Sequence, residues 1–399
     1  MVISEPSVTP RNNRPLEGIL VADFSRVLAG PYATMLLADL GAEVIKVEGP
    51  GGDDTRSWTP PVRPDGVSTY YSAINRNKRS VVLDFKNPED RGYAQTLAAR
   101  ADVLVENFKP GGLLRFGLDY DTVKQTNESI IYCSISGFGT AEGASLPGYD
   151  LIVQAVSGLM SLTGDADGSP YRAGISVFDV MAGLHSTIGI LAALRRREIS
   201  GGGEQIEASL MASALSGLVN QTSAYVAGGV TPHRMGNAHP SLFPYEPLPT
   251  ADSDLIVTAG NDQQFRKLCR VLEIAELADD PRFAANADRT ENREQLRPLL
   301  VERLRTQPAR HWFEKLNEVG VPNGPINSIA EGIAYAEHLG LEPIVDIGNG
   351  SDKTPGVRHP LSYRGFEPRY DQAPPRLGQH NNEVRTWLAH PLPDQNGQS

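Results

Sequence analysis

The chain has 399 residues, 40% of them hydrophobic, so it can bury a sizeable core and form roughly two or three domains. Its formal net charge of −11 excludes a general nucleic-acid or anionic-membrane partner, because phosphate neutralisation requires a basic face. Its two cysteines, Cys133 and Cys269, fit neither a disulfide framework nor a metal site, which predicts a reducing, cytoplasmic compartment and no bound metal.

The N-terminal residues predict no targeting segment. Residues 1–15 lack the apolar stretch of a signal peptide. No later stretch supplies the ~18 uninterrupted apolar residues of a membrane helix. We therefore expect neither a leader nor a membrane-spanning segment.

Strands and helices alternate over the first third of the chain. The pattern predicts strands over 19–25, 42–48, 80–85, 101–108 and 129–138. A helix is expected from Pro31 to about Leu40, with Gly41 as its stop, and another is opened by Asn87 and Pro88 and runs to about Arg100. This alternation predicts an α/β fold with a Rossmann-like parallel sheet and right-handed crossovers.

One carboxylate, Asp179, interrupts the apolar stretch 174–194, GISVFDVMAGLHSTIGILAAL. Apolar residues at helical spacing predict a helix from Met181 to about Arg195–Arg197. An ionised carboxylate is costly to bury unless it is paired, capped or used. Asp179 either caps this helix, or is kept ionised by backbone amides while Val177 and Phe178 exclude water from it. The second arrangement would make it a nucleophile toward a thioester.

The composition changes at about residue 226, where turn-forming residues precede a short strand at 255–260 and a mostly helical stretch at 262–340. We expect the first part of a large α/β domain at 1–225, a smaller α+β domain at 226–325, and a C-terminal segment, 326–399, that returns to the large domain. The Pro-rich part, 355–399, shows little periodicity and is expected to pack over another surface.

Common cofactor and hydrolase motifs are missing from the sequence. Glu48 follows the second strand as in dinucleotide-binding proteins, but the preceding loop SRVLAGP has one glycine, Gly30, and Pro31 removes an amide that a pyrophosphate would use. The sequence contains no GxSxG, HExxH or Walker motif. Basic residues nevertheless gather in the first third, where they form either a solvated surface or an anion site: Arg76, Lys78, Arg79, Lys109 and Arg115.

Five stretches, in order, resemble the class III CoA-transferase family, which contains formyl-CoA transferase, carnitine CoA-transferase and the α-methylacyl-CoA racemases. They are residues 16–58, 75–85, 105–118, 148–159 and 178–197. The resemblance implies two ring-shaped chains threaded into an interlocked homodimer. It also implies an acyl-CoA and a free carboxylic acid as substrates, with coenzyme A bound as a substrate and no tightly bound cofactor.

The resemblance also implies a set of site residues. Asp179 matches the aspartate that carries the acyl group in the transferases. On the CoA side the resemblance implies Lys78, Arg79, Asn107, Phe108 and Arg115. The substrate pocket would include Leu28, Trp58, Tyr70, Tyr149 and His239. Phe178 stands where the family often has glycine, which would narrow the space at the nucleophile.

Four positions bear on the reaction that the family scaffold performs here and on its acceptor. The racemases have a histidine where this chain has Tyr149, and tyrosine, titrating near ~10, is the poorer base at neutral pH. A CoA-transferase is therefore favoured, with a racemase or another CoA-ester enzyme as the alternative. Leu28 replaces a glutamine of formyl-CoA transferase, which disfavours oxalate as acceptor. Arg172 and His239 either meet a second carboxylate, as in succinate, or lie on the surface.

Overall fold

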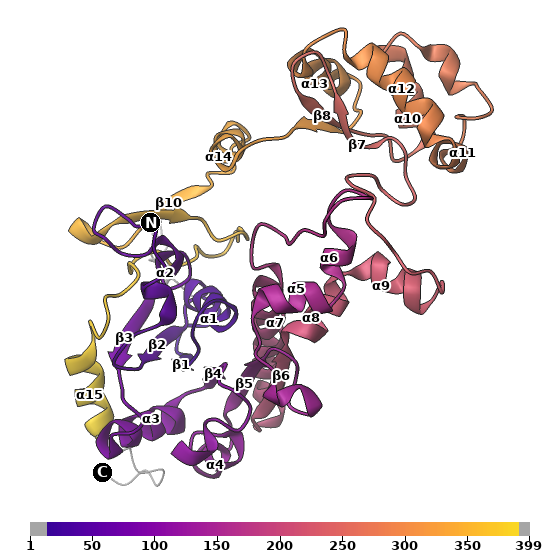
Figure 1. Ribbon diagram of the computed structural model, residues 1–399. Coiled ribbons are helices and arrows are strands. Elements are labelled where there is room, and N and C mark those ends of the chain that lie inside the picture. Colours follow the sequence, from indigo (N-terminus) through magenta and orange to yellow (C-terminus); the bar gives the residue numbers. More distant parts are fainter. Residues whose placement is uncertain (1–13, 391–399) are drawn as a thin grey trace, which may run out of the picture. The chain divides into compact units, whose positions relative to one another are not determined.

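The computed structural model describes residues 14–390, which form two compact units (Figure 1). The first unit contains residues 14–157, Ala173–Val226 and 342–390, and the second contains Gly158–Arg172 and Ala227–Leu341. These limits differ from the expected domains, because Gly158–Arg172 belongs to the second unit, which also continues to Leu341 rather than ending at 325. The residues 1–13 and 391–399, on which part of the leader and C-terminal expectations rest, lie outside the described residues.

A six-stranded parallel sheet is the centre of the first unit. Its strands are β1 (Leu20–Asp23), β2 (Glu43–Glu48), β3 (Lys78–Val82), β4 (Val103–Glu106), β5 (Ile131–Ser136) and β6 (Glu204–Ser209). Their order is β3-β2-β1-β4-β5-β6, and every neighbouring pair is parallel. The predicted α/β class and parallel sheet are confirmed. The order reverses between β1 and β4, which is where doubly wound sheets bind ligands.

Helices connect these strands or follow the last of them. They are α1 (Ala29–Asp39), α2 (Thr69–Ala73), α3 (Pro88–Arg100), α4 (Tyr120–Thr126), α5 (Asp150–Val156), α7 (Val177–Ser200), α8 (Leu210–Gly217) and α9 (Val219–Val226). The predicted start of α3 is confirmed, since the Asn87 side chain accepts a hydrogen bond from Glu89 N and Pro88 occupies the first turn.

The long helix α7 packs against α1, α8, β5 and β6. It begins at Val177 rather than at the predicted Met181, so Asp179 lies inside its first turn and is not its cap residue. Gly183 allows close packing, because a Cβ atom there would lie 2.7 Å from the carbonyl oxygen of Ala29 in α1. By length and hydropathy alone α7 could cross a membrane, which was not expected from the sequence, and in this structure it packs against helices and strands of the first unit.

The C-terminal segment contains regular structure that the sequence did not indicate. β10 (Ile344–Ile347) and β11 (Thr354–Val357) form an antiparallel pair, and α15 (Asn381–Ala389) follows. α15 contacts α3 and β3, and its residues Val384 and Leu388 are buried with the sheet core. The segment does return to the first unit, through this apolar helix face.

The second unit has its own core. Its antiparallel sheet consists of β7 (Tyr245–Pro249), β8 (Asp254–Thr258) and β9 (Asn323–Pro325), in that order. Its helices are α6 (Leu159–Leu162), α10 (Asp262–Val271), α11 (Asn286–Glu291), α12 (Arg293–Leu304), α13 (Ala309–Glu318) and α14 (Ile329–His338). The fully buried Arg289 ties this unit together by donating to the carbonyl oxygens of Phe243 and Phe283 and to Asp262.

Candidate functional site

A cavity of about 610 Å³ lies at the point where the strand order reverses. The loops after β1 and β4 form part of its wall through Arg26, Leu28, Asn107 and Phe108. The starts of α5 and α7 contribute Tyr149, Asp150 and Asp179. The structure therefore brings the predicted nucleophile together with five of the other predicted site residues: Leu28, Trp58, Asn107, Phe108 and Tyr149.

The N-terminus of α7 is capped by a residue of another helix. Asp150 Oδ1 accepts hydrogen bonds from the backbone amides of Phe178, at 2.7 Å, and Asp179, at 3.1 Å. Ser176 occupies the cap position of α7 but makes no side-chain capping bond. The helix amides that the sequence analysis assigned to Asp179 are thus bound by Asp150.

Burial, and secondly the negative charge of Asp150, raise the pKa of Asp179 to about 7. This corrects the alternative in which helix amides keep Asp179 ionised. A carboxylate with a pKa near neutrality is only partly ionised there, but its ionised form is more basic than an ordinary aspartate. Such perturbed groups in a cavity are typical of reactive sites.

Aromatic residues form another part of the wall. The rings of Trp58 and Tyr70 pack edge to face with centroids 5.2 Å apart. Trp58 lines the cavity of Asp179, while Tyr70 and Trp58 together line a neighbouring hollow. Burial, aided by the charges of Asp179 and Asp150, raises the pKa of Tyr70, although a hydrogen bond with Ser176 opposes this. Tyr149 is largely exposed at the mouth.

Phe178 does not narrow the cavity, as the sequence had suggested. Its side chain is 2% exposed and does not line the cavity of Asp179. Only its backbone amide serves the site, through Asp150. The side chain next to Asp179 therefore contributes to the core instead of restricting the cavity.

Asn107 shapes the loop after β1. Its side chain accepts from Arg26 N at 2.9 Å and donates to Arg26 O at 2.7 Å, which fixes the backbone at the cavity wall. The basic side chains on this wall are Arg26, which pairs with Asp54 at 3.1 Å, and Lys109. Arg26 was not among the site residues predicted from the sequence. Its place in the loop after β1, where the strand order reverses, could have indicated that it lines the site.

Lys78 and Arg79 do not line this cavity, contrary to the expectation of a basic rim. Lys78 Nζ is buried and bonds Asp23 Oδ2 at 3.1 Å and the carbonyl oxygen of Pro31 at 2.8 Å. Arg79 pairs with Glu383 at 2.7 Å and with Glu43. Both side chains are engaged by neighbouring carboxylates, so their role here is to hold the loop after β1 and to attach α15.

Arg115 also lies apart from the lining of the Asp179 cavity. It is exposed in the short turn Leu114–Phe116, with its guanidinium 4.6 Å from the ring centroid of Phe116. Arg76, in turn, is buried against Asp39, with Nη2 2.6 Å from Oδ2. Of the basic group that the sequence analysis singled out, Lys109 alone reaches the cavity wall within the described residues.

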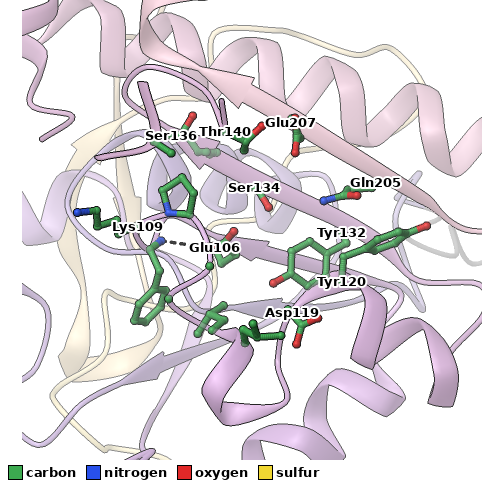
Figure 2. Close-up of a pocket in the computed structure, with 18 residues that line it drawn as sticks. Glu106, Lys109, Asp119, Tyr120, Tyr132, Ser134, Ser136, Thr140, Gln205 and Glu207 are labelled. Atoms are coloured by element: carbon green, nitrogen blue, oxygen red, sulfur yellow. Dashed lines mark hydrogen bonds between the residues drawn. The ribbon is translucent and has the colours of Figure 1, made fainter. Parts of the chain in front are cut away.

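A second hollow of about 400 Å³ lies over the carboxyl ends of β4, β5 and β6 (Figure 2). It shares Phe108, Lys109 and Ser136 with the Asp179 cavity. Its charged lining consists of Glu106, Asp119 and Glu207 against Lys109. Burial raises the pKa of Glu106, which accepts a hydrogen bond from Phe108 N at 2.8 Å. This excess of carboxylates disfavours a phosphate in the second hollow.

Two predicted residues, Arg172 and His239, belong to the second unit. Arg172 is exposed. His239 Nδ1 accepts from Ser241 N at 3.0 Å, and its ring lies 5.0 Å from that of Tyr245. Their expected contact with a second carboxylate stays a prediction.

Comparison with known proteins agrees with this fold. Residues 16–381 match CoA-transferase family III. The chain is 44% identical to the succinate–glutarate CoA-transferase of Agrobacterium fabrum, covering 95% of this chain and 97% of that protein. It is 38% identical to the acetyl-CoA:oxalate CoA-transferase of Acetobacter aceti, covering 94% and 96%. A crystal structure of a CAIB/BAIF family protein from Brucella suis superposes with a TM-score of 0.85 at 42% identity, covering 94% and 100%.

The chain therefore belongs to CoA-transferase family III. The predicted family and enzyme class, a class III CoA-transferase, are confirmed.

Proposed function

We propose that this protein transfers CoA from an acyl-CoA to a dicarboxylic acid, with Asp179 as the acyl carrier. The observation that carries the proposal is the place of Asp179: a basic carboxylate on the wall of the cavity at the strand reversal. A carboxylate that is shielded from water attacks a thioester more readily than a hydrated one.

The proposed reaction conserves the activated acyl bond. Asp179 attacks the thioester carbonyl, forming a mixed anhydride and releasing CoA thiolate. The thiolate attacks the Asp179 carbonyl, which gives an aspartyl-CoA thioester and the free donor acid. The acceptor acid then forms a new anhydride with Asp179 and releases the thiolate, which attacks the acceptor carbonyl to give the new acyl-CoA and free Asp179.

Two observations support a dicarboxylic acceptor. The relatives compared above are named for succinate, glutarate and oxalate, all of which carry two carboxylates. The cavity wall has Arg26 and Lys109 as cations, which suit anionic groups of the substrates. Leu28 disfavoured oxalate as the acceptor, but one relative is named for oxalate. Oxalate therefore belongs among the acids to be tested.

We further propose that the active protein is a homodimer. Helix α9 has no buried residue, and its side chains Val219, Tyr225 and Val226 are each more than half exposed. Exposed apolar faces of this kind typically mark a protein interface. Light scattering should give the mass of two chains, and the mass of one chain would contradict this proposal.

The proposed function is tested with succinyl-CoA and a panel of acids, with mass spectrometry of the CoA esters formed. We expect CoA exchange with dicarboxylic acids and much less with monocarboxylic acids of equal length. Arg26→Ala should raise KM for acyl-CoA more than it lowers kcat, because a charge contact binds ground and transition states alike. Arg115→Ala is its matched comparison. A transfer to monocarboxylic acids as fast as to dicarboxylic acids would contradict the assigned acceptor class.

A further inference from the structure

We propose that Asp150 is a positioning residue for this reaction: it holds a fixed negative charge beside Asp179, and acylation of Asp179 removes the resulting repulsion. The inference rests on the proposed role of Asp179 as acyl carrier. It adds a residue that acts on the nucleophile through electrostatics and helix geometry.

The geometry makes Asp150 part of the nucleophile's support. It is the first residue of α5 and is 6% exposed. Its Oδ1 atom binds the amides of Phe178 and Asp179, so the carboxylate of Asp150 is attached to the same turn of backbone that carries the Asp179 side chain. This bond fixes the start of α7 and occupies the amides that would otherwise stabilise the ionised form of Asp179.

Gln154, one turn further along α5, holds Asp150 in place. Its Nε2 donates to Asp150 Oδ2 and, at 3.1 Å, to the carbonyl oxygen of Ile175, while its Oε1 accepts from Ala173 N at 2.8 Å. Gln154 is fully buried. The groups that bond the Asp150 side chain are all donors, which suits a carboxylate, and they leave it little freedom to rotate away.

Other groups facing the Asp179 cavity do not replace this charge. Tyr70 of α2 lies near Asp179, and Arg26, Asp54, Lys109 and Tyr149 line the wall. Arg26 is paired with Asp54. The charge that raises the pKa of Asp179 is that of Asp150, and its effect is second to that of burial.

The chemical consequence follows from the charge balance. Free Asp179 and Asp150 form a pair of like charges in a partly buried place, which raises the energy of the free carboxylate. In the mixed anhydride and in the aspartyl-CoA thioester Asp179 is neutral, so the repulsion is gone. Asp150 therefore favours the acylated enzyme over the free enzyme and makes the attacking carboxylate more basic.

The test compares charge with geometry at position 150. Asp150→Asn keeps an acceptor for the two amides but removes the charge, and Asp150→Ser removes the charge without placing an amide NH2 group against Gln154. Asp150→Glu keeps the charge. The measurement is the pH midpoint of kcat/KM for succinyl-CoA, followed from about pH 5 to about pH 9. Asp252→Asn is the matched control, because Asp252 Oδ1 likewise accepts the first amide of a helix, Ala309 N at 2.8 Å, in the second unit.

We expect the Asn and Ser variants to lower this midpoint by about one pH unit and to reduce the plateau at high pH, since a less basic carboxylate is a weaker nucleophile. Asp150→Glu and Asp252→Asn should keep the wild-type midpoint. A loss of activity at all pH values with an unmoved midpoint in folded Asn and Ser variants would overturn the proposal and leave Asp150 a helix cap alone.

Infrared titration of the Asp179 carboxyl, taken as wild type minus Asp179→Asn, separates this inference from the proposed function. It needs no substrate and should show the same downward shift in Asp150→Asn. If the Asp179 titration shifts in Asp150→Asn but the wild-type enzyme exchanges no CoA, the proposed function is contradicted. If the wild-type enzyme exchanges CoA but the titration does not shift in Asp150→Asn, the role of Asp150 is contradicted.

Discussion

At the scale of single residues, neighbours in the sequence have unrelated roles because strands alternate their faces. Lys78 and Arg79 are adjacent in β3, yet Lys78 is buried beside Asp23 and Arg79 reaches Glu383 of α15. Burial lowers the pKa of Lys78 to about 8, partly offset by Asp23. The sequence shows that basic residues cluster at this strand, but it could not show that Lys78 and Arg79 would pair with carboxylates of the protein itself.

Replacing Lys78 tests this structural role. Lys78→Met should destabilise the protein by roughly 3 kcal/mol, because it leaves Asp23 buried without its partner at 3.1 Å. Lys315→Met is the control, since Lys315 forms an exposed pair with Glu318 and should change stability by less than about 0.5 kcal/mol. Chemical denaturation measures both variants. Equal losses of stability in Lys78→Met and Lys315→Met would show that the buried pair of Lys78 and Asp23 does not stabilise the loop after β1.

Asp179 makes the protein less stable as the pH rises. Its pKa is about 7 in the folded chain against an ordinary 3.8, so between these values the folded state keeps a proton that the unfolded state has lost. Asp179→Asn removes this dependence. Its Tm relative to wild type should rise steadily from about pH 4 to about pH 7 and then stay constant.

Asp252, whose pKa is lowered in the folded chain rather than raised, provides the control for this titration. A backbone hydrogen bond from Ala309 N lowers the pKa of Asp252, so Asp252→Asn should lose stability relative to wild type above the ordinary carboxyl pKa. A Tm difference for Asp179→Asn that does not vary with pH would mean that Asp179 titrates normally.

At the scale of elements, local signals located helices better than they located helix starts. The start of α3 followed from Asn87 and Pro88, which are its own cap residues. The start of α7 could not be read in the same way, because its cap comes from Asp150, 29 positions before Asp179 in the chain. β6 was missed for a different reason: Glu204–Ser209 is polar and largely half-exposed, so it lacks the apolar run of a central strand.

The contact between α7 and α1 depends on Gly183. Gly183→Ala should destabilise the protein by about 1 to 3 kcal/mol, because the new Cβ meets the Ala29 carbonyl at 2.7 Å and the two helices must separate. Gly332→Ala in α14, where nothing lies within 4 Å, should instead stabilise by up to ~1 kcal/mol. Thermal unfolding distinguishes the two signs, and a stabilised Gly183→Ala variant would contradict the packing.

At the scale of the whole molecule, the sequence was sufficient for the family and for the parallel sheet apart from β6, while the role of Asp179 as nucleophile stays a prediction. The βα alternation predicted the parallel sheet, and the ordered motifs placed Asp179 and Asn107 at one site, where the cavity now joins them. The division into units was beyond local patterns, because Gly158–Arg172 joins a unit formed mainly by residues from 227 onward. Such long-range association leaves no periodic signal in the segment itself.

The racemase alternative makes a separate prediction about the reaction. A racemase exchanges the α-proton of a 2-methylacyl-CoA, whereas a transferase reacts at the carbonyl carbon. Because Tyr149 is 64% exposed and stands where the racemases have histidine, we expect no enzyme-dependent deuterium at the α-carbon in deuterated water. Mass spectrometry of the recovered ester measures this, and rapid incorporation without CoA exchange would support the racemase.

The central claim, that Asp179 carries the acyl group, is tested most directly by trapping the intermediate. Hydroxylamine added during turnover of succinyl-CoA should convert Asp179 to its hydroxamate, because the anhydride and the aspartyl-CoA thioester both expose an activated Asp179 carbonyl. Peptide mass spectrometry locates the adduct, with Asp179→Asn and enzyme without substrate as controls. We expect a hydroxamate at Asp179 that forms only with succinyl-CoA, and a hydroxamate on a different residue, with Asp179 unmodified, would show that Asp179 is not the acyl carrier.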